Sequence, residues 1–300
     1  MNGYIEANDY GWASLRAAAG AAELVFVPQV GGRLMGIRLG GRELLFVNPE
    51  LAGTTPETVD GFPLWGGEKT WVAPQSGWAN AVPFPALDSG PYHVAQQDGR
   101  LVLTSAVCPL SGLQIVREIA LGPGASWSTR HTIRNRGRRP VFAGPWTVMM
   151  INRDARFFVP GAGQPVFMLD APGDAGTTGT LTRIDCFDAT RFKTGHHLAE
   201  GWFAAFVPLA DSRAAMIVQF GATHPDGGRW AHGHPAEIFN SDLHPYCEME
   251  LHGPAHDLAP GDETSWQMRT AVALLDHMPE SEAAVRAAVG EAAGQAAVPS

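Results

Sequence analysis

Short apolar and β-branched runs recur along the first 275 residues of the chain, and turn-forming residues separate them. Residues 23–49 read ELVFVPQVGGRLMGIRLGGRELLFVNP, in which two Gly pairs interrupt the apolar runs. A Gly pair supplies the positive φ angles of a tight turn, so this stretch predicts tandem β-hairpins. Further strands are expected, at a spacing of about ten residues, at 92–96, 100–107, 114–121, 127–134, 141–151, 201–207, 214–220, 236–239, 246–252 and 264–275.

Three stretches depart from this rhythm. Residues 141–151 are almost entirely apolar, which predicts a strand buried on both faces. Residues 160–179 are rich in Gly, Pro and Asp and predict a long loop. Residues 279–293, PESEAAVRAAVGEAA, have acids in their opening turn and small helix-forming residues after it, which predicts a helix. No repeat or linker divides the chain, so we expect one domain over 1–278, followed by a helix and tail over 279–300.

The composition supports an all-β class. Apolar residues make up 45% of the chain and charged residues only 17%, and 35 Gly and 23 Pro suit many short strands joined by turns. The formal net charge of −9 contains no run of like charges, which argues against a nucleic-acid partner.

The cysteines and the N-terminal residues indicate the cellular setting. Cys108, Cys186 and Cys247 are far apart and lack CxxC spacing, so we expect buried free thiols rather than a disulfide framework or a thiolate zinc site. The N-terminal residues show no basic stretch followed by an apolar one, and no window of about 18 apolar residues occurs. We therefore expect a cytoplasmic protein with no membrane partner. The oligomeric state is open.

Residues 61–78, GFPLWGGEKTWVAPQSGW, have an unusual composition. Three tryptophans surround a Gly pair and the adjacent Glu68 and Lys69. The segment has neither the apolar run of a buried strand nor the periodicity of a surface helix, so we expect an irregular loop. Flat aromatic faces beside charged groups suit a polyhydroxylated ligand. The expected partner is a small-molecule carbohydrate.

Residues 246–252, YCEMELH, alternate between two faces. Period-2 alternation sends Cys247, Met249 and Leu251 to the core and the other members to the opposite face, namely Tyr246, Glu248, Glu250 and His252. If that second face meets water, the two glutamates need no explanation. If it lines a cleft, their like charges should raise the pKa of one carboxyl and suit it to proton transfer.

Several segments resemble galactose-mutarotase-like proteins, the aldose 1-epimerase superfamily. The Glu-x-Glu strand followed by GPAHDLAPGDE resembles the C-terminal part of that superfamily, VPQVGGRLMGIRLGGRELL resembles its opening hairpins, and HTIRNRGRRPVFAGPW resembles its central strands. The segment FPLWGGEKTWVAPQS is similar to an uncharacterised branch of it. The resemblance covers about residues 23–275 and rests on the shared order of short motifs. It implies a large twisted antiparallel β-sandwich, with a carbohydrate cleft on one concave sheet face.

The resemblance also implies a catalytic pair. A glutamate on a late strand is the base in the epimerases, which corresponds to Glu248 or Glu250 here, with Glu248 preferred. A histidine is their acid, but this chain has Pro145-Trp146-Thr147 at the matching segment, so the acid is not carried over. Three substitutes are open, namely Glu68 with its neighbour Lys69, His244 and His252. Trp146 is either a core residue or a stacking face for a pyranose ring.

One further string suggests a different chemistry. His232 and His234, with Glu237, form an HxHxxE pattern that could chelate a metal, as in cupin-like sites. The spacing is shorter than usual, and Gly233 and Pro235 interrupt the strand, so we expect neither metal nor cofactor and keep a metal-dependent enzyme as a lesser alternative. No GxSxG elbow, P-loop or GxGxxG after a strand occurs.

The sequence thus favours a sugar-acting enzyme with mutarotase-like or epimerase-like proton transfer. The alternative is a non-catalytic carbohydrate-binding or sensing protein on the same fold. The residues expected to be catalytic are Glu248, Glu250, His244 and Glu68. Those expected to bind the sugar are Trp65, Lys69, Trp71, Gln75, Trp146 and His252.

Overall fold

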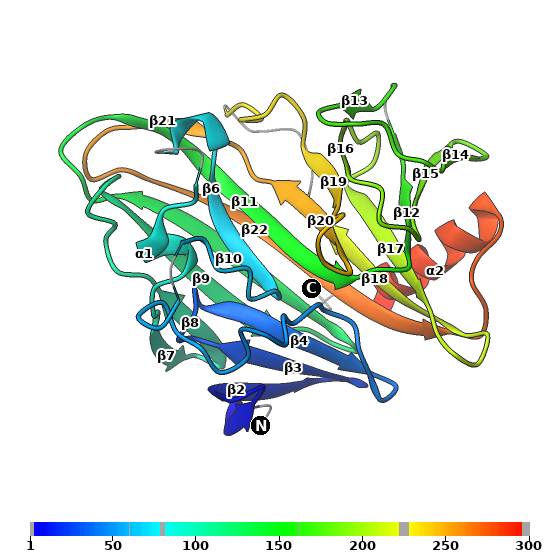
Figure 1. Ribbon diagram of the computed structural model, residues 1–300, viewed down its shortest axis with the longest axis horizontal. Helices are drawn as coiled ribbons and strands as arrows, with labels where there is room; N and C mark the ends of the chain where they lie inside the picture. The colour runs from blue at the N-terminus through cyan, green and yellow to red at the C-terminus, as the bar shows by residue number, and fades with distance from the viewer. Residues whose placement is uncertain (1–2, 60, 79–81, 162, 222–227, 296–300) are drawn as a thin grey trace.

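The computed structural model describes residues 3–59, 61–78, 82–161, 163–221 and 228–295, and these form two antiparallel sheets with a C-terminal helix (Figure 1). The first sheet runs, in spatial order, β1 (Ile5–Asp9), β2 (Trp12–Ala19), β3 (Ala22–Val27), β4 (Arg33–Leu39), β6 (Glu68–Ala73), β11 (Val141–Asn152), β20 (Tyr246–His252), β19 (Ala236–Asn240), β16 (Phe192–His196) and β13 (Val166–Phe167). Two short strands extend it, β5 (Arg42–Glu43) beside β4 and β21 (His256–Leu258) beside β11.

The second sheet runs, in spatial order, β14 (Ala175–Thr178), β15 (Leu181–Cys186), β12 (Ala155–Val159), β17 (Trp202–Pro208), β18 (Ala214–Phe220), β22 (Glu263–Leu275), β10 (Ser126–Asn135), β9 (Leu113–Leu121), β8 (Arg100–Thr104) and β7 (His93–Gln97). The helical elements are η1 (Gln75–Gly77), a single 3₁₀ turn, α1 (Pro85–Asp88) and α2 (Glu282–Gln295). The all-β class, the sandwich of two large antiparallel sheets and the short C-terminal helix are confirmed.

The main core lies between the two sheets. Its largest cluster joins residues such as Phe26 and Ile37 of the first sheet to Ile115, Ile133 and Ile217 of the second. Burial of such apolar side chains stabilises the sandwich by about 1.5–3 kcal/mol for each one.

Helix α2 covers the outer face of the second sheet. Val285 and Val289 of the helix pack with Phe206, Met216 and Val218 of the strands β17 and β18. No comparable helix packs on the outer face of the first sheet among the described residues. That face is where a ligand can approach, and β6, β11 and β20 lie in front of β10 and β22 in Figure 1.

The expected irregular loop at 61–78 is wrong in its second half, because β6 occupies Glu68–Ala73 between β4 and β11. Two adjacent charges at the start of this strand hid its alternation. Before it, Gly66 has a φ of 101°, and a Cβ there would lie 2.0 Å from the carbonyl oxygen of Phe46. Only glycine fits this entry to the strand.

The predicted loop at 160–179 needs correction, and the prediction for the cysteines is confirmed. The expected loop at 160–179 contains the short strands β13 and β14, apart from residue 162, which lies outside the described residues. The three cysteines are buried free thiols, as expected. No helix in the described part of the chain is long and apolar enough to cross a membrane.

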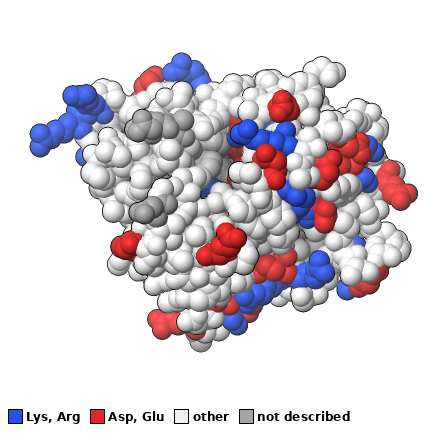
Figure 2. Space-filling view, in the orientation of Figure 1, with Lys and Arg blue, Asp and Glu red and all other residues white. Residues whose placement is uncertain are grey.

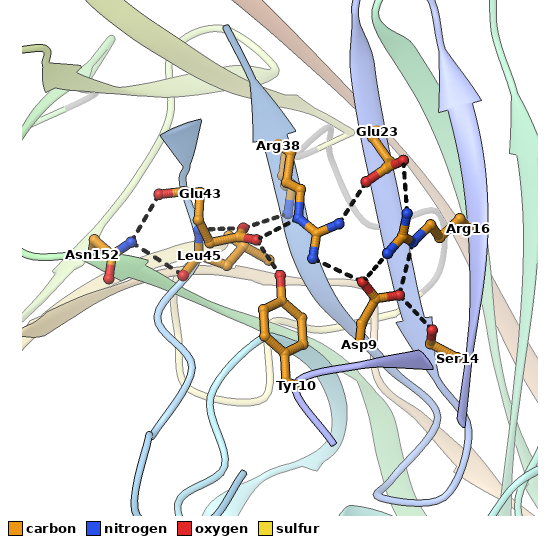
Figure 3. A network of polar contacts seen from close by, with 10 residues as sticks. Asp9, Tyr10, Ser14, Arg16, Glu23, Arg38, Glu43, Leu45 and Asn152 are labelled. Carbon is orange, nitrogen blue, oxygen red and sulfur yellow. Dashed lines mark hydrogen bonds and ion pairs between the residues drawn. The ribbon is translucent and has the colours of Figure 1, made fainter. Parts of the chain in front are cut away.

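A charged ladder joins the edge strands of the first sheet (Figure 3). Asp9 on β1 lies 2.7 Å from Arg16 on β2 and 2.9 Å from Arg38 on β4, and Arg38 also contacts Glu23 on β3 at 2.6 Å. Burial opposes ionisation of Asp9, but hydrogen bonds from Arg16, Ser14 and Arg38 outweigh it and lower its pKa to about 2. The ladder therefore ties four strands together at this edge.

Candidate functional site

A cavity of about 460 Å³ opens on the outer face of the first sheet. Its walls combine aromatic rings with charged groups, including Trp71, Trp146, Arg191, Lys193 and Glu248. Figure 2 shows acidic and basic residues together on this face, over the region of β16, β19 and β20. A second cavity of about 400 Å³ lies beside it, but the residues found to line it carry no ionisable side chain. The first cavity is therefore the better candidate for chemistry.

The aromatic wall comes from β6, β11 and the turn after β6. The Trp71 and Trp146 rings meet edge to face at 4.9 Å, and Trp78 stacks on Trp146 at 5.5 Å. Both facing tryptophans are held by carboxylates, since Trp71 Nε1 donates to Asp88 Oδ1 at 2.6 Å and Trp146 Nε1 donates to Glu250 Oε2 at 2.8 Å. The partly exposed Trp71 ring suits the apolar face of a sugar ring, whereas Trp146 is buried behind it.

Glu248 lines the cavity at the centre of the sheet. On β20 it pairs with Met150 of β11 and Phe239 of β19, and it is only 6% exposed. Burial raises its pKa, while the ammonium groups of Lys69 and Lys193 act in the opposite direction. The carboxylate is thus a stronger base than an exposed glutamate, and neighbouring positive charge supports its ionised form.

Lys69 lies deep beside the aromatic wall and is 1% exposed. Its Nζ lies 4.1 Å from the Trp71 ring centroid and 3.7 Å from Met150 Sδ. Burial lowers its pKa to about 8, with a further contribution from Arg33. A lysine with this pKa can release a proton near neutral pH.

Lys193 on β16 joins two carboxylates. Its Nζ lies 3.0 Å from Glu250 Oε2 and 2.7 Å from Glu237 Oε2. Burial alone would lower the pKa of Lys193, but Glu250 and Glu237 reverse the effect and raise it. Glu250 itself is fully buried, and this burial raises its pKa well above the usual value despite Lys193.

Three histidines converge on the other oxygen of Glu237. The distances to Oε1 are 2.7 Å from His232 Nδ1, 2.9 Å from His234 Nε2 and 3.1 Å from His252 Nε2. Burial opposes ionisation of Glu237, but the histidines outweigh it and hold its pKa well below the usual value. Burial lowers the pKa of His252 to about 4, so this imidazole is neutral. The HxHxxE string is therefore a physical cluster, and His252 joins it from β20.

The predicted site residues divide into two groups. The structure brings together, at or beside the cavity, those on the outer face of the first sheet and the turn after β6, namely Glu248, Glu250, His252, Lys69, Trp71, Gln75 and Trp146. It places Glu68, Trp65 and His244 elsewhere.

Each of these three has a different environment. Glu68 points between the sheets and pairs with Arg117 of β9 at 2.6 Å, because alternation on β6 directs it opposite to Lys69. Trp65 is fully buried in a separate cluster, and its Nε1 donates to Thr54 Oγ1 at 2.9 Å. His244 is half-buried, 6.1 Å from the Phe46 ring. The geometry does not support a role in the cavity for any of them.

Sequence reasoning missed several cavity residues. Lys193 lies on β16 and Arg191 directly before it, and no apolar pattern indicated this strand, because FKTGH has only one large apolar residue. Asp88 stands in the short helix α1 and reaches the site through Trp71.

Comparisons with solved structures bear on the fold. No protein-family model matches the chain, and neither does any curated protein. The structure is similar to a galactose mutarotase-like protein from Lactobacillus casei ATCC 334, with a TM-score of 0.54, 11% identity and coverage of 87% of this chain and 100% of that one. It is also similar to a candidate aldose 1-epimerase from Escherichia coli K12, with a TM-score of 0.55, 13% identity and coverage of 87% and 98%. This chain has the galactose-mutarotase-like fold.

The galactose-mutarotase-like fold also occurs within longer chains. The structure is similar to a TPR-domain containing protein from Parabacteroides distasonis ATCC 8503, with a TM-score of 0.58 and 14% identity. The match covers 89% of this chain but only 48%, about half, of that one.

Trp146 and His252 lie together in the candidate site. At the segment where the resemblance implies a histidine, Trp146 stacks on His252 at 5.2 Å between ring centroids. His252 is the direct register partner of Trp146 on the neighbouring strand β20.

Proposed function

We propose that this protein acts on a carbohydrate by proton transfer, with Glu248 as the base. The observation that carries the proposal is the position of Glu248, a buried carboxylate that lines a cavity with Trp71, Trp146 and Lys193. A cavity of about 460 Å³ lies within the usual range of small-ligand sites, about 300–1,000 Å³. The reaction class is that of a mutarotase or epimerase.

The proposed roles follow from the positions of the groups. A pyranose would stack on the partly exposed Trp71 ring, and Lys193 and Arg191 at the cavity wall would donate hydrogen bonds to its oxygens. Glu248 takes the proton from a hydroxyl or a ring carbon, and Lys69, with a pKa of about 8, returns one. Glu250 holds Trp146 and Lys193 in place through the contacts described above.

The substitution Glu248→Gln tests the base. The amide keeps the shape of the side chain but cannot accept a proton at this step, so turnover should fall by about 10²–10⁴-fold. Binding should change by only a few-fold. Anomer exchange and product formation, followed by NMR across a panel of aldoses and uronates, would measure turnover, and calorimetry would measure binding.

The matched control is Glu263→Gln, which removes a carboxylate from a rim pair with Arg134 on the opposite sheet. It should leave both turnover and binding unchanged. If Glu248→Gln turns over the sugar at the wild-type rate, Glu248 is not the base.

A second candidate function is carbohydrate binding without catalysis. The observation that favours it is Trp146, which occupies the segment where the resemblance implies the acid. In that case the wild-type protein binds a sugar of the panel and gives no anomer exchange above the buffer rate, and Trp71→Ala abolishes the binding.

A further inference from the structure

The cluster around Glu237 has more imidazole nitrogens than hydrogen bonding needs. Three ring nitrogens lie within 3.1 Å of Oε1, while Oε2 faces Lys193. A carboxylate oxygen has two lone-pair positions, so one oxygen cannot accept three well-directed hydrogen bonds. The surplus leaves His252 without a hydrogen bond to Oε1, and it places two imidazole nitrogens beside a carboxylate oxygen, which are ligand types of zinc sites.

His252 is the least satisfied member of the cluster. It is fully buried, and neither Nδ1 nor Nε2 of its ring has a hydrogen-bond partner among the described residues. Stacking on Trp146 at 5.2 Å and contact with His232 at 4.6 Å hold the ring in place. Leaving a buried imidazole nitrogen without a hydrogen bond destabilises the protein, and a metal ion at Nε2 would offset that cost.

The spacing of the three ligand atoms fits one metal ion. One ligand atom from each of His232, Glu237 and His252 lies within 4.8 Å of the others. Metal–ligand bonds of about 2.0–2.1 Å in a tetrahedral site place neighbouring ligand atoms about 3.3 Å apart. Two of the three separations, 2.7 Å and 3.1 Å to Glu237 Oε1, would therefore lengthen by about 0.6 Å and 0.2 Å.

We propose that His232, Glu237 and His252 form a binding site for a divalent transition-metal ion, with Zn²⁺ as the probe. Two imidazoles and one carboxylate are a ligand set of borderline softness that leaves coordination positions open. His234 and Lys193 hold the Glu237 carboxylate from either side, as outer residues do around metal ligands. This site does not depend on the role of Glu248.

Two neighbours shape the cluster. The backbone N–H of Gln75 donates to His232 Nε2 at 3.1 Å, so Nδ1 carries the ring proton and donates to Glu237 in the metal-free protein. A metal at Nδ1 displaces that proton, and Nε2 then becomes the protonated nitrogen and gives up its hydrogen bond from Gln75. A Cβ on Gly195 would lie 2.3 Å from His234 Cε1, so the glycine leaves room for that ring. Strand β16 and the turn after β6 thus both help to position the histidines of the cluster.

The test uses untagged full-length protein that has been dialysed against a chelator. Calorimetry with Zn²⁺ and elemental analysis after gel filtration should give one equivalent of zinc for each chain. Co²⁺ in place of Zn²⁺ should give visible absorption typical of nitrogen and oxygen ligands. His232→Ala should weaken zinc binding by at least about tenfold, since even outer residues contribute 10–100-fold; His232 is partly exposed and its loss is the one most easily tolerated by the fold.

Two control variants show whether zinc binds at this cluster or at another histidine or carboxylate of the chain. His244→Ala removes a histidine outside the cluster and should keep full zinc binding, and so should Glu248→Gln, which tests the base. Circular dichroism of the metal-free variants checks that each is folded, and His252→Ala provides a second ligand variant. Absence of zinc binding in the wild type, or equal zinc affinity in His232→Ala and the wild type, overturns the proposal.

Discussion

Lys69 should destabilise the fold in which it stands. Its side chain is 1% exposed, and burial lowers its pKa from 10.5 to about 8. Each tenfold change in proton affinity corresponds to about 1.4 kcal/mol, so the folded protein loses about 3 kcal/mol at neutral pH by keeping this lysine charged. Lys69→Met removes the charge and leaves an apolar chain of similar length among Trp71 and Met150.

The net effect includes one opposing contribution. The cation–π contact with Trp71, worth about 0.5–2 kcal/mol, is lost in the variant. We therefore expect Lys69→Met to raise the free energy of unfolding by about 1–3 kcal/mol at pH 7. If Lys69 is the acid, the same substitution should lower turnover, so stability and activity would move in opposite directions.

The pH dependence of stability gives an independent test of whether Lys69 destabilises the fold. The folded pKa lies below the unfolded value, so the unfolded chain binds more protons between about pH 8 and 10.5, and wild-type stability should rise with pH there relative to Lys69→Met. The assay is urea unfolding of both proteins at intervals from pH 7 to 10.5. A variant less stable than the wild type at pH 7, or a difference that stays constant over this window, would refute the reasoning.

Two further substitutions test other charged groups. Lys193→Met, the same replacement in the same cavity, should act in the opposite direction and lower the free energy of unfolding by about 3–5 kcal/mol, because Glu237 and Glu250 lose their shared cation; urea unfolding that shows no loss contradicts this. Asp9→Asn should lower the free energy of unfolding by up to about 2 kcal/mol at pH 7, since the folded pKa is about 2 against an ordinary 3.8. That difference is present above pH 3.8 and should vanish as the pH falls through about 2, and a difference that persists in acid rules out the ladder as its source.

Some strands could be predicted from the sequence because one of their faces is apolar. On β20, Cys247, Met249 and Leu251 face the core and Glu248 and Glu250 the cavity, as alternation predicts. On β6 the same alternation exists, but Glu68 and Thr70 occupy core-facing positions, where Glu68 is satisfied by Arg117. A buried ion pair between sheets has no signature in a single strand's pattern.

The candidate site could be predicted only in part for a similar reason. Neighbouring residues of the candidate site come from β20, β19 and β16, whose spatial order differs from their order along the chain. The HxHxxE string could be seen locally, but His252 joins it through the pairing of Glu237 with Glu250, and Lys193 through β16. Strand order depends on long-range packing, which local periodicity does not contain.

Lys193 links the proposed sugar site to the proposed metal site. Its ammonium group bridges Glu250, which positions Trp146 beside the proposed sugar site, and Glu237, which belongs to the proposed metal site. A sugar and a cation that both interact with residues held by the Lys193 ammonium group have linked binding free energies. By reciprocity, any factor by which a cation changes sugar affinity must equal the factor by which the sugar changes cation affinity.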